Sequence, residues 1–120
     1  MIHSKKIKIP IYGVSFTVIG YTEPKELEMK FSKINFEPPV DHFVGGCFKD
    51  GDNLYLGFWL YDGKPSPGIV AHECKHLVNE VFIYAHQELD RYNDEAECYL
   101  LGWLVNCVWE FLEKNFKDSV

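Results

Sequence analysis

The segment from Ala96 to Lys114, AECYLLGWLVNCVWEFLEK, constrains the fold of this chain more than any other segment. Its apolar residues would occur on nearly every side of a helix, and a helix of that kind is buried on more than one face. Asn93 or Asp94 is a suitable N-cap for it. Gly102 lowers the stability of the helix and indicates that another backbone approaches closely there. The sequence therefore predicts a long C-terminal helix packed against much of the chain.

The elements before this helix predict an α+β fold. Apolar residues recur at helical spacing from Ile69 to about His86, and a short helix is expected to begin at Pro24. Residues from Ile11 to Tyr21 predict a strand, and the runs 43–48 and 54–60 predict a hairpin. We expect one domain over residues 1–120, with an antiparallel-rich sheet of three or four strands packed on two long C-terminal helices.

Composition argues against several classes of protein. The net charge of −6 disfavours a general nucleic-acid binder, which needs a basic surface. No apolar run is long enough for a transmembrane helix, and the N-terminus lacks the apolar region of a secretion signal. We expect a cytoplasmic protein with neither nucleic acid nor membrane as partner. The cysteines form no C-x-x-C pair, so they are expected to be reduced, buried small residues: Cys47, Cys74, Cys98 and Cys107.

Residues 72–76, His-Glu-Cys-Lys-His, form an H-E-x-x-H motif inside the predicted helix. Helical residues four apart share a face, so His72 and His76 can bind one metal ion. Glu73 lies at the edge of that face and could accept a proton from water. Lys75 is expected to point into solvent. The alternative is a surface pair of histidines, but the apolar residues 68–71 before the motif are not typical of a solvated face.

Catalytic zinc usually takes three protein ligands. A third histidine in the H-E-x-x-H-x-x-G-x-x-H pattern is excluded, because Asn79 and Phe82 occupy its glycine and histidine positions. Glu95 and Glu97, at the start of the last helix, are the other candidates. Periodicity does not separate them, since both helix faces contain apolar residues, and both could simply be acids favoured by the helix dipole.

Two segments, VAHECKH (70–76) and DEAECYLLGWL (94–104), resemble the small zincin-like metallopeptidases of phage and prophage genomes. In these proteins an H-E-C-x-H helix precedes a D-E-A-x-A-Y-L-x-G-x-L helix. The resemblance implies a zincin-like fold and a gluzincin-type site, with His72, His76 and Glu95 on zinc and Glu73 as the general base. It favours Glu95 over Glu97, because Glu95 matches the glutamate of D-E-A. Cys98 replaces the second alanine of the pattern, a small-for-small change.

The sequence thus predicts a zinc-dependent metallopeptidase, in which Glu73 assists the attack of zinc-bound water on a peptide bond. Its expected partner is a peptide or protein substrate. The alternative is a catalytically silent zincin-like protein that binds zinc and acts through interactions. A chance motif in a helical packing protein would not explain the matched glutamate of the second helix.

Two further roles are expected. Tyr99, one turn after Glu95, could stabilise the tetrahedral intermediate. The residues that could do so in its place are Tyr84, His86, Tyr92 and His42. The strand 53–60 is expected to be an edge strand that pairs with an extended substrate. Its aromatic residues could shape substrate subsites or simply belong to the core: Tyr55, Phe58 and Trp59.

Overall fold

The computed structural model describes residues 1–34, 44–61 and 66–116. Four strands form one sheet in the order β1-β2-β4-β3. The strands are β1 (Ile2–Ile9), β2 (Val14–Tyr21), β3 (Gly45–Asp50) and β4 (Asn53–Trp59). β2 and β4 run parallel, whereas β1 with β2 and β3 with β4 are antiparallel. The predicted α+β class, with an antiparallel-rich sheet and two long C-terminal helices, is confirmed.

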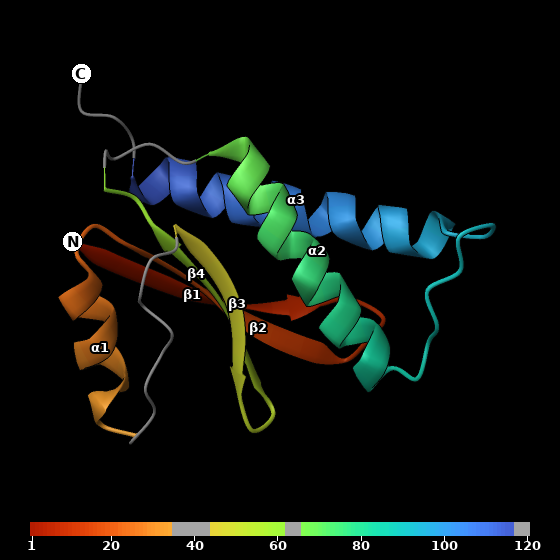
Figure 1. The fold of residues 1–120 in the computed structure, drawn as a ribbon, viewed down its shortest axis with the longest axis horizontal. Coiled ribbons are helices and arrows are strands. Elements are labelled where there is room, and N and C mark those ends of the chain that lie inside the picture. Colours follow the sequence, from red (N-terminus) through yellow and green to blue (C-terminus); the bar gives the residue numbers. More distant parts are fainter. Residues whose placement is uncertain (35–43, 62–65, 117–120) are drawn as a thin grey trace.

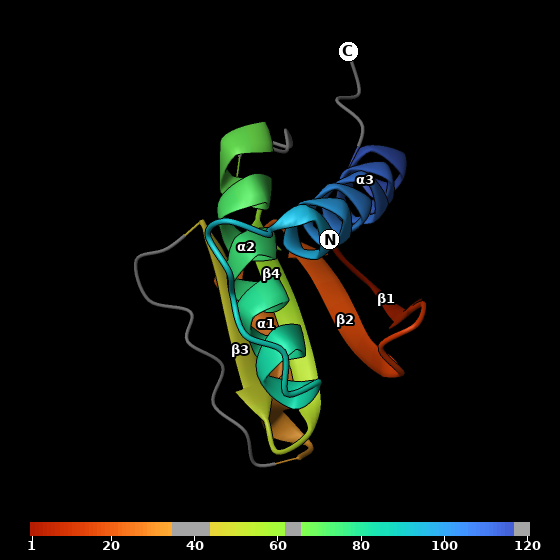
Figure 2. The ribbon, with the colours of Figure 1, turned by 90° about the vertical axis from the view of Figure 1, so that its right-hand side faces the viewer.

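Three helices cover the two faces of this sheet (Figure 1). The long helices α2 (Pro67–Tyr84) and α3 (Glu95–Asn115) lie on one face. The short helix α1 (Pro24–Ser32) packs on the other face. Figure 2 shows α2 above β3 and β4, and α3 to the side, toward β2 and β1. The long helices therefore divide the sheet between them, and α2 is the helix next to β3.

Alternation along β2 builds two cores, because successive strand residues point to opposite faces. Phe16 and Val18 are buried with side chains of α2 and α3. Ile19 and Tyr21 are buried with Leu27 and other residues of α1. The larger core holds α2 in place, and α2 contains the H-E-x-x-H motif.

The N-terminal part of the sheet differs from the sequence-based expectation. β1 was not predicted, because its lysines hide the pattern of a strand, although Ile9 faces the larger core. The predicted strand 11–21 begins only at Val14, since the chain turns at Ile11 and Gly13, both of which have positive φ. The predicted hairpin is present, with a two-residue turn in which Gly51 has φ +59°.

Helix α3 begins after Asp94, one of the two candidate N-caps, but it is less buried than expected. Its core side consists of Leu100, Leu104, Val108, Phe111 and Leu112. Another strip is exposed to solvent: Cys98, Tyr99, Gly102 and Asn106. The predicted close approach of a backbone at Gly102 is wrong, since among the described residues a Cβ there would meet no atom within 4 Å. The sheet and α2 cover α3 from one side only.

The cysteines also differ in part from the expectation. All four thiols are free, but only Cys74 is buried; Cys47 and Cys107 are half-buried, and Cys98 is exposed. Within the described residues, no helix combines the length and the apolar character that crossing a membrane requires.

Candidate metal site

Helix α2 presents the H-E-x-x-H motif from its second and third turns. Ser66 caps the helix by accepting a hydrogen bond from the backbone N–H of Ile69, and Pro67 occupies the first helical position, where a missing N–H costs nothing. Val70 and Leu77 anchor the helix in the core on either side of the motif. The motif is thus fixed to the sheet by a well-formed helix.

The three motif side chains converge, as the helical spacing predicts. The imidazole rings of His72 and His76 lie with their centroids 5.0 Å apart, at 70° to each other. Nε2 of His72 is 3.9 Å from Oε2 of Glu73. One possible ligand atom from each of the three residues lies within 4.8 Å of the other two. Zn²⁺ and other divalent transition metals bind to sets of two imidazoles and one carboxylate.

Burial differs sharply between these side chains. The side chain of His72 is 67% exposed, whereas that of Glu73 is only 11% exposed. Glu73 is the one charged residue among the buried residues of the described chain. The two histidines therefore form an exposed ridge on α2, and the carboxylate lies lower, toward β3.

Gly45 of β3 makes this position of Glu73 possible. A Cβ on Gly45 would lie 3.1 Å from Cγ of Glu73 and 2.7 Å from Cγ2 of Ile69. Real Cβ atoms essentially never approach as closely as the second of these distances. A residue without a side chain is therefore required where β3 passes beneath the motif.

A hollow of about 370 Å³ opens between β3 and α2 beside the motif. We call it the β3–α2 hollow; its lining residues are Gly45, Gly46, Cys47, Glu73, His76, Asn79 and Glu80. Burial raises the pKa of the Cys47 thiol to about 12, and the nearby charges of Glu80 and Glu73 act in the same direction. The thiol thus stays protonated at neutral pH, which leaves the imidazole and the carboxylates as the stronger donors there.

Lys75 does not point into solvent as predicted. Its Nζ lies 2.9 Å from Oε2 of Glu97 on α3 and donates a hydrogen bond of 2.7 Å to Oδ1 of Asn79. Its side chain is 39% exposed, and that of Glu97 is 20% exposed. The pair joins α2 to α3 directly beside the histidines, a contact that no motif in the sequence predicted.

The two candidate carboxylates of α3 occupy different faces. Glu95 is exposed and lies on the same strip as the exposed Cys98 and Tyr99. Glu97 faces α2, where it pairs with Lys75. Within the described residues, neither carboxylate belongs to the group formed by His72, Glu73 and His76. The structure therefore distinguishes the two glutamates by the face of α3 on which each lies, which helical periodicity alone could not do.

Tyr99 is not among the described residues that line the β3–α2 hollow. Its side chain is 76% exposed and lines a different, apolar hollow, with Ile11 at the β1–β2 turn and Trp103 on α3. The alternatives Tyr84, His86 and Tyr92 are also exposed, and none of them lines the β3–α2 hollow. His42 lies outside the described residues.

The expected edge strand is an inner strand. β4 lies between β2 and β3, and the edge next to α2 is β3. Phe58 is buried in the larger core. Tyr55 and Trp59 pack against the smaller core on the α1 side of the sheet. These aromatic residues are therefore not among the described residues that line the β3–α2 hollow. The adjacent glycines Gly45 and Gly46 line it instead, and this glycine pair is visible in the sequence.

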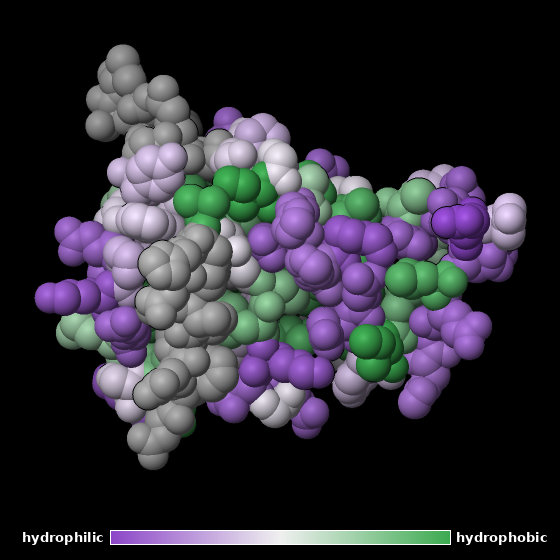
Figure 3. Space-filling model, viewed as in Figure 1, coloured by the Kyte–Doolittle hydropathy of each residue, from purple (hydrophilic) through white to green (hydrophobic). Residues whose placement is uncertain are grey.

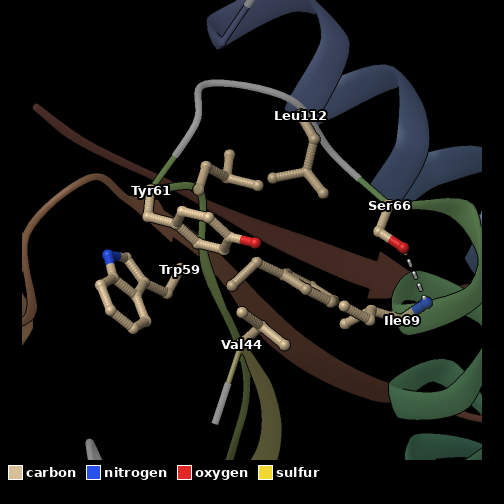
Figure 4. Close-up of a pocket in the computed structure, with 8 residues that line it drawn as sticks. Val44, Trp59, Tyr61, Ser66, Ile69 and Leu112 are labelled. Atoms are coloured by element: carbon tan, nitrogen blue, oxygen red, sulfur yellow. Dashed lines mark hydrogen bonds between the residues drawn. The ribbon is translucent and has the colours of Figure 1, made fainter. Parts of the chain in front are cut away.

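A second, smaller hollow of about 110 Å³ lies near the start of α2 (Figure 4). Val44, Phe58 and Leu112 contribute apolar walls, and the ring of Tyr61 lies across it. Tyr61 is the one titratable residue among its described lining residues. The described lining of this hollow is therefore mainly apolar surface.

The exposed surface around α2 is mainly hydrophilic in its middle part (Figure 3). Apolar patches are found toward the end where α2 finishes (Figure 3). Comparison of the chain with protein-family models, curated proteins and solved structures gives no match.

Proposed function

We propose that this protein is a zinc-dependent metallopeptidase. The observation that carries the proposal is the convergence of His72, Glu73 and His76 on one exposed turn of α2, at the wall of the β3–α2 hollow. His72 and His76 would hold the metal, with a carboxylate from α3 as the third ligand. When bound, zinc would lower the pKa of water at the site and polarise the scissile carbonyl.

Glu73 would act as the general base. Its carboxylate is positioned next to His72 and held from below by the approach of β3 at Gly45. An Oε atom would accept a proton from the attacking water and pass it to the nitrogen of the leaving amine. Its partial burial limits rotation of the side chain, so that the base stays aimed at the ridge of histidines.

An extended peptide or protein segment is the substrate that fits this arrangement. β3 is the edge strand next to the motif and lines the β3–α2 hollow with Gly45, Gly46 and Cys47. A substrate segment could add to this edge and place its peptide bond near the histidines. We place this activity in the cytoplasm.

The test is a comparison of wild type with Glu73→Gln on peptide and protein substrates. We expect the variant to retain bound zinc and to lose peptide cleavage, by roughly 100-fold or more for removal of a general base. Glu80→Gln is the matched control, since Glu80 lines the same hollow and pairs with Lys49 at 3.3 Å. Cleavage that survives in Glu73→Gln would remove Glu73 as the base. Zinc binding without cleavage in the wild type would favour the silent zinc-binding alternative.

A further inference from the structure

The contact between Lys75 and Glu97 lies on the flank of the histidine pair that faces α3. On a helix, residues three apart are surface neighbours, with Cβ atoms roughly 5–6 Å apart, so Lys75 is next to His72 and directly precedes His76. The carboxylate of Glu97 reaches this flank and lies 2.9 Å from Nζ of Lys75. The opposite flank is occupied by Glu73 and β3. A carboxylate therefore lies on each flank of the histidine pair: Glu73 beside β3, and Glu97 at Lys75 on the side of α3.

Glu95 cannot make the same approach from the helix as it stands. Two residues along an α-helix turn the side chain by about 200°, so Glu95 and Glu97 point in nearly opposite directions. Burial agrees with this geometry: the Glu95 strip is exposed, whereas Leu100 and Leu104, which follow Glu97 at helical spacing, are buried. Bringing Glu95 to α2 would require α3 to rotate and to expose its apolar side.

We propose that Glu97 is the third metal ligand and that Lys75 is its counter-ion in the metal-free protein. This inference rests on the proposed metal site at His72 and His76. The carboxylate of Glu97 would exchange its ion pair with Lys75 for coordination to the metal. Lys75 would keep its hydrogen bond to Asn79 or turn outward, which its partial exposure allows. A cation inside the motif thus competes with the metal for one ligand.

Zinc affinity tests this exchange without any measurement of activity. The metal-free full-length chain is titrated with Zn²⁺ in competition with a chromophoric chelator. Loss of a group that hydrogen-bonds to a metal ligand typically lowers metal affinity about 10–100-fold. Glu97→Gln changes a ligand itself, so we expect it to weaken zinc binding by roughly 100-fold or more. Glu95→Gln removes the same charge from the same helical turn and should leave the affinity within about threefold.

Removal of Lys75 should strengthen zinc binding rather than weaken it. Lys75→Met removes the competing cation, and an ion pair of the strength typical near a protein surface predicts roughly fivefold tighter zinc binding. The double variant Lys75→Met/Glu97→Gln removes both charges of the ion pair, so neither is left without its partner. It replaces Glu97→Gln in the titration if that single variant does not fold. It should bind zinc as weakly as Glu97→Gln.

Each other outcome overturns the inference. If Glu95→Gln weakens binding and Glu97→Gln does not, Glu95 is the ligand. If both variants weaken binding equally, the effect is general electrostatics, and if neither does, the third ligand lies elsewhere. These results would leave intact the proposed metal binding by His72 and His76 and the role of Glu73 as the base, and would change only the third ligand. A wild-type chain that binds no zinc, or a His76→Ala variant that binds it normally, would instead refute the metal site itself.

Discussion

At the scale of single residues, the site depends on a contrast in burial along one turn of α2. His72 is exposed, and Glu73, the next residue, is nearly covered. The H-E-x-x-H spacing predicted that the two histidines share a face, because that follows from helical geometry alone. It could not predict which tertiary contacts hold Glu73 and Lys75, because these come from β3 and α3, which are distant in sequence.

Gly45→Ala should destabilise the protein and disturb Glu73. The new methyl group would lie 2.7 Å from Cγ2 of Ile69 and 3.1 Å from Cγ of Glu73. Overpacking of this kind costs typically about 1–3 kcal/mol, so the free energy of unfolding in urea should fall by that amount. Gly51→Asn, at a turn glycine with φ +59° and open space around it, is the control and should change stability less. An unchanged midpoint for Gly45→Ala would show that β3 is not tightly packed under α2.

At the scale of elements, the amphipathic helices were the most predictable part of the fold. The sequence placed α2 within two residues of its start and end, because periodicity is a local property. It offered Asn93 or Asp94 as the N-cap of α3, and the structure has Asp94 there. β1 escaped prediction because edge strands contain lysines that interrupt an apolar pattern. The order of the strands depends on long-range pairing, so the sequence suggested β4 as the edge where the structure has β3.

Gly102→Ala should stabilise α3. Gly102 is in the helix and is exposed, and no atom of the described residues lies within 4 Å of where its Cβ would be. Replacing a helical glycine by alanine gains roughly 0.5–1 kcal/mol, because alanine loses less conformational entropy on folding. Urea denaturation should therefore show a higher midpoint with an unchanged slope. A lower midpoint would mean that something packs against this strip of α3.

At the scale of the whole molecule, the candidate site lies where three elements meet. β3 supports Glu73 from below, α2 presents the histidines, and α3 brings Glu97 to Lys75. The sequence could not decide which glutamate of α3, Glu95 or Glu97, faces α2, because that depends on how α3 is rotated about its own axis. That rotation is set by the packing of its core side against the sheet and α2.

Stability should fall at alkaline pH. Burial raises the pKa of Cys47 and Cys74 from 9.0 to about 12, and that of Tyr21 from 10.0 to about 12. These groups are neutral in the folded state and ionise more readily when unfolded. Their contribution to stability is therefore complete below about pH 9 and is lost as the pH rises toward 12.

Urea unfolding at pH 7, 9 and 10.5 measures this decline. Cys47→Ala should reduce the dependence on pH, whereas Cys98→Ala, at an exposed position, should reduce it less. A wild-type midpoint that stays constant from pH 7 to 10.5 would contradict the burial of these groups.

The most direct test of the metal site is the zinc content of the protein purified without chelator. We expect about one zinc per chain for the wild type. We expect little or none for His76→Ala and an unchanged content for His86→Asn. His86 is an exposed histidine with φ +56°, a backbone conformation that asparagine tolerates. A wild-type protein without bound metal, or equal zinc content in all three proteins, would contradict a metal site at His72 and His76.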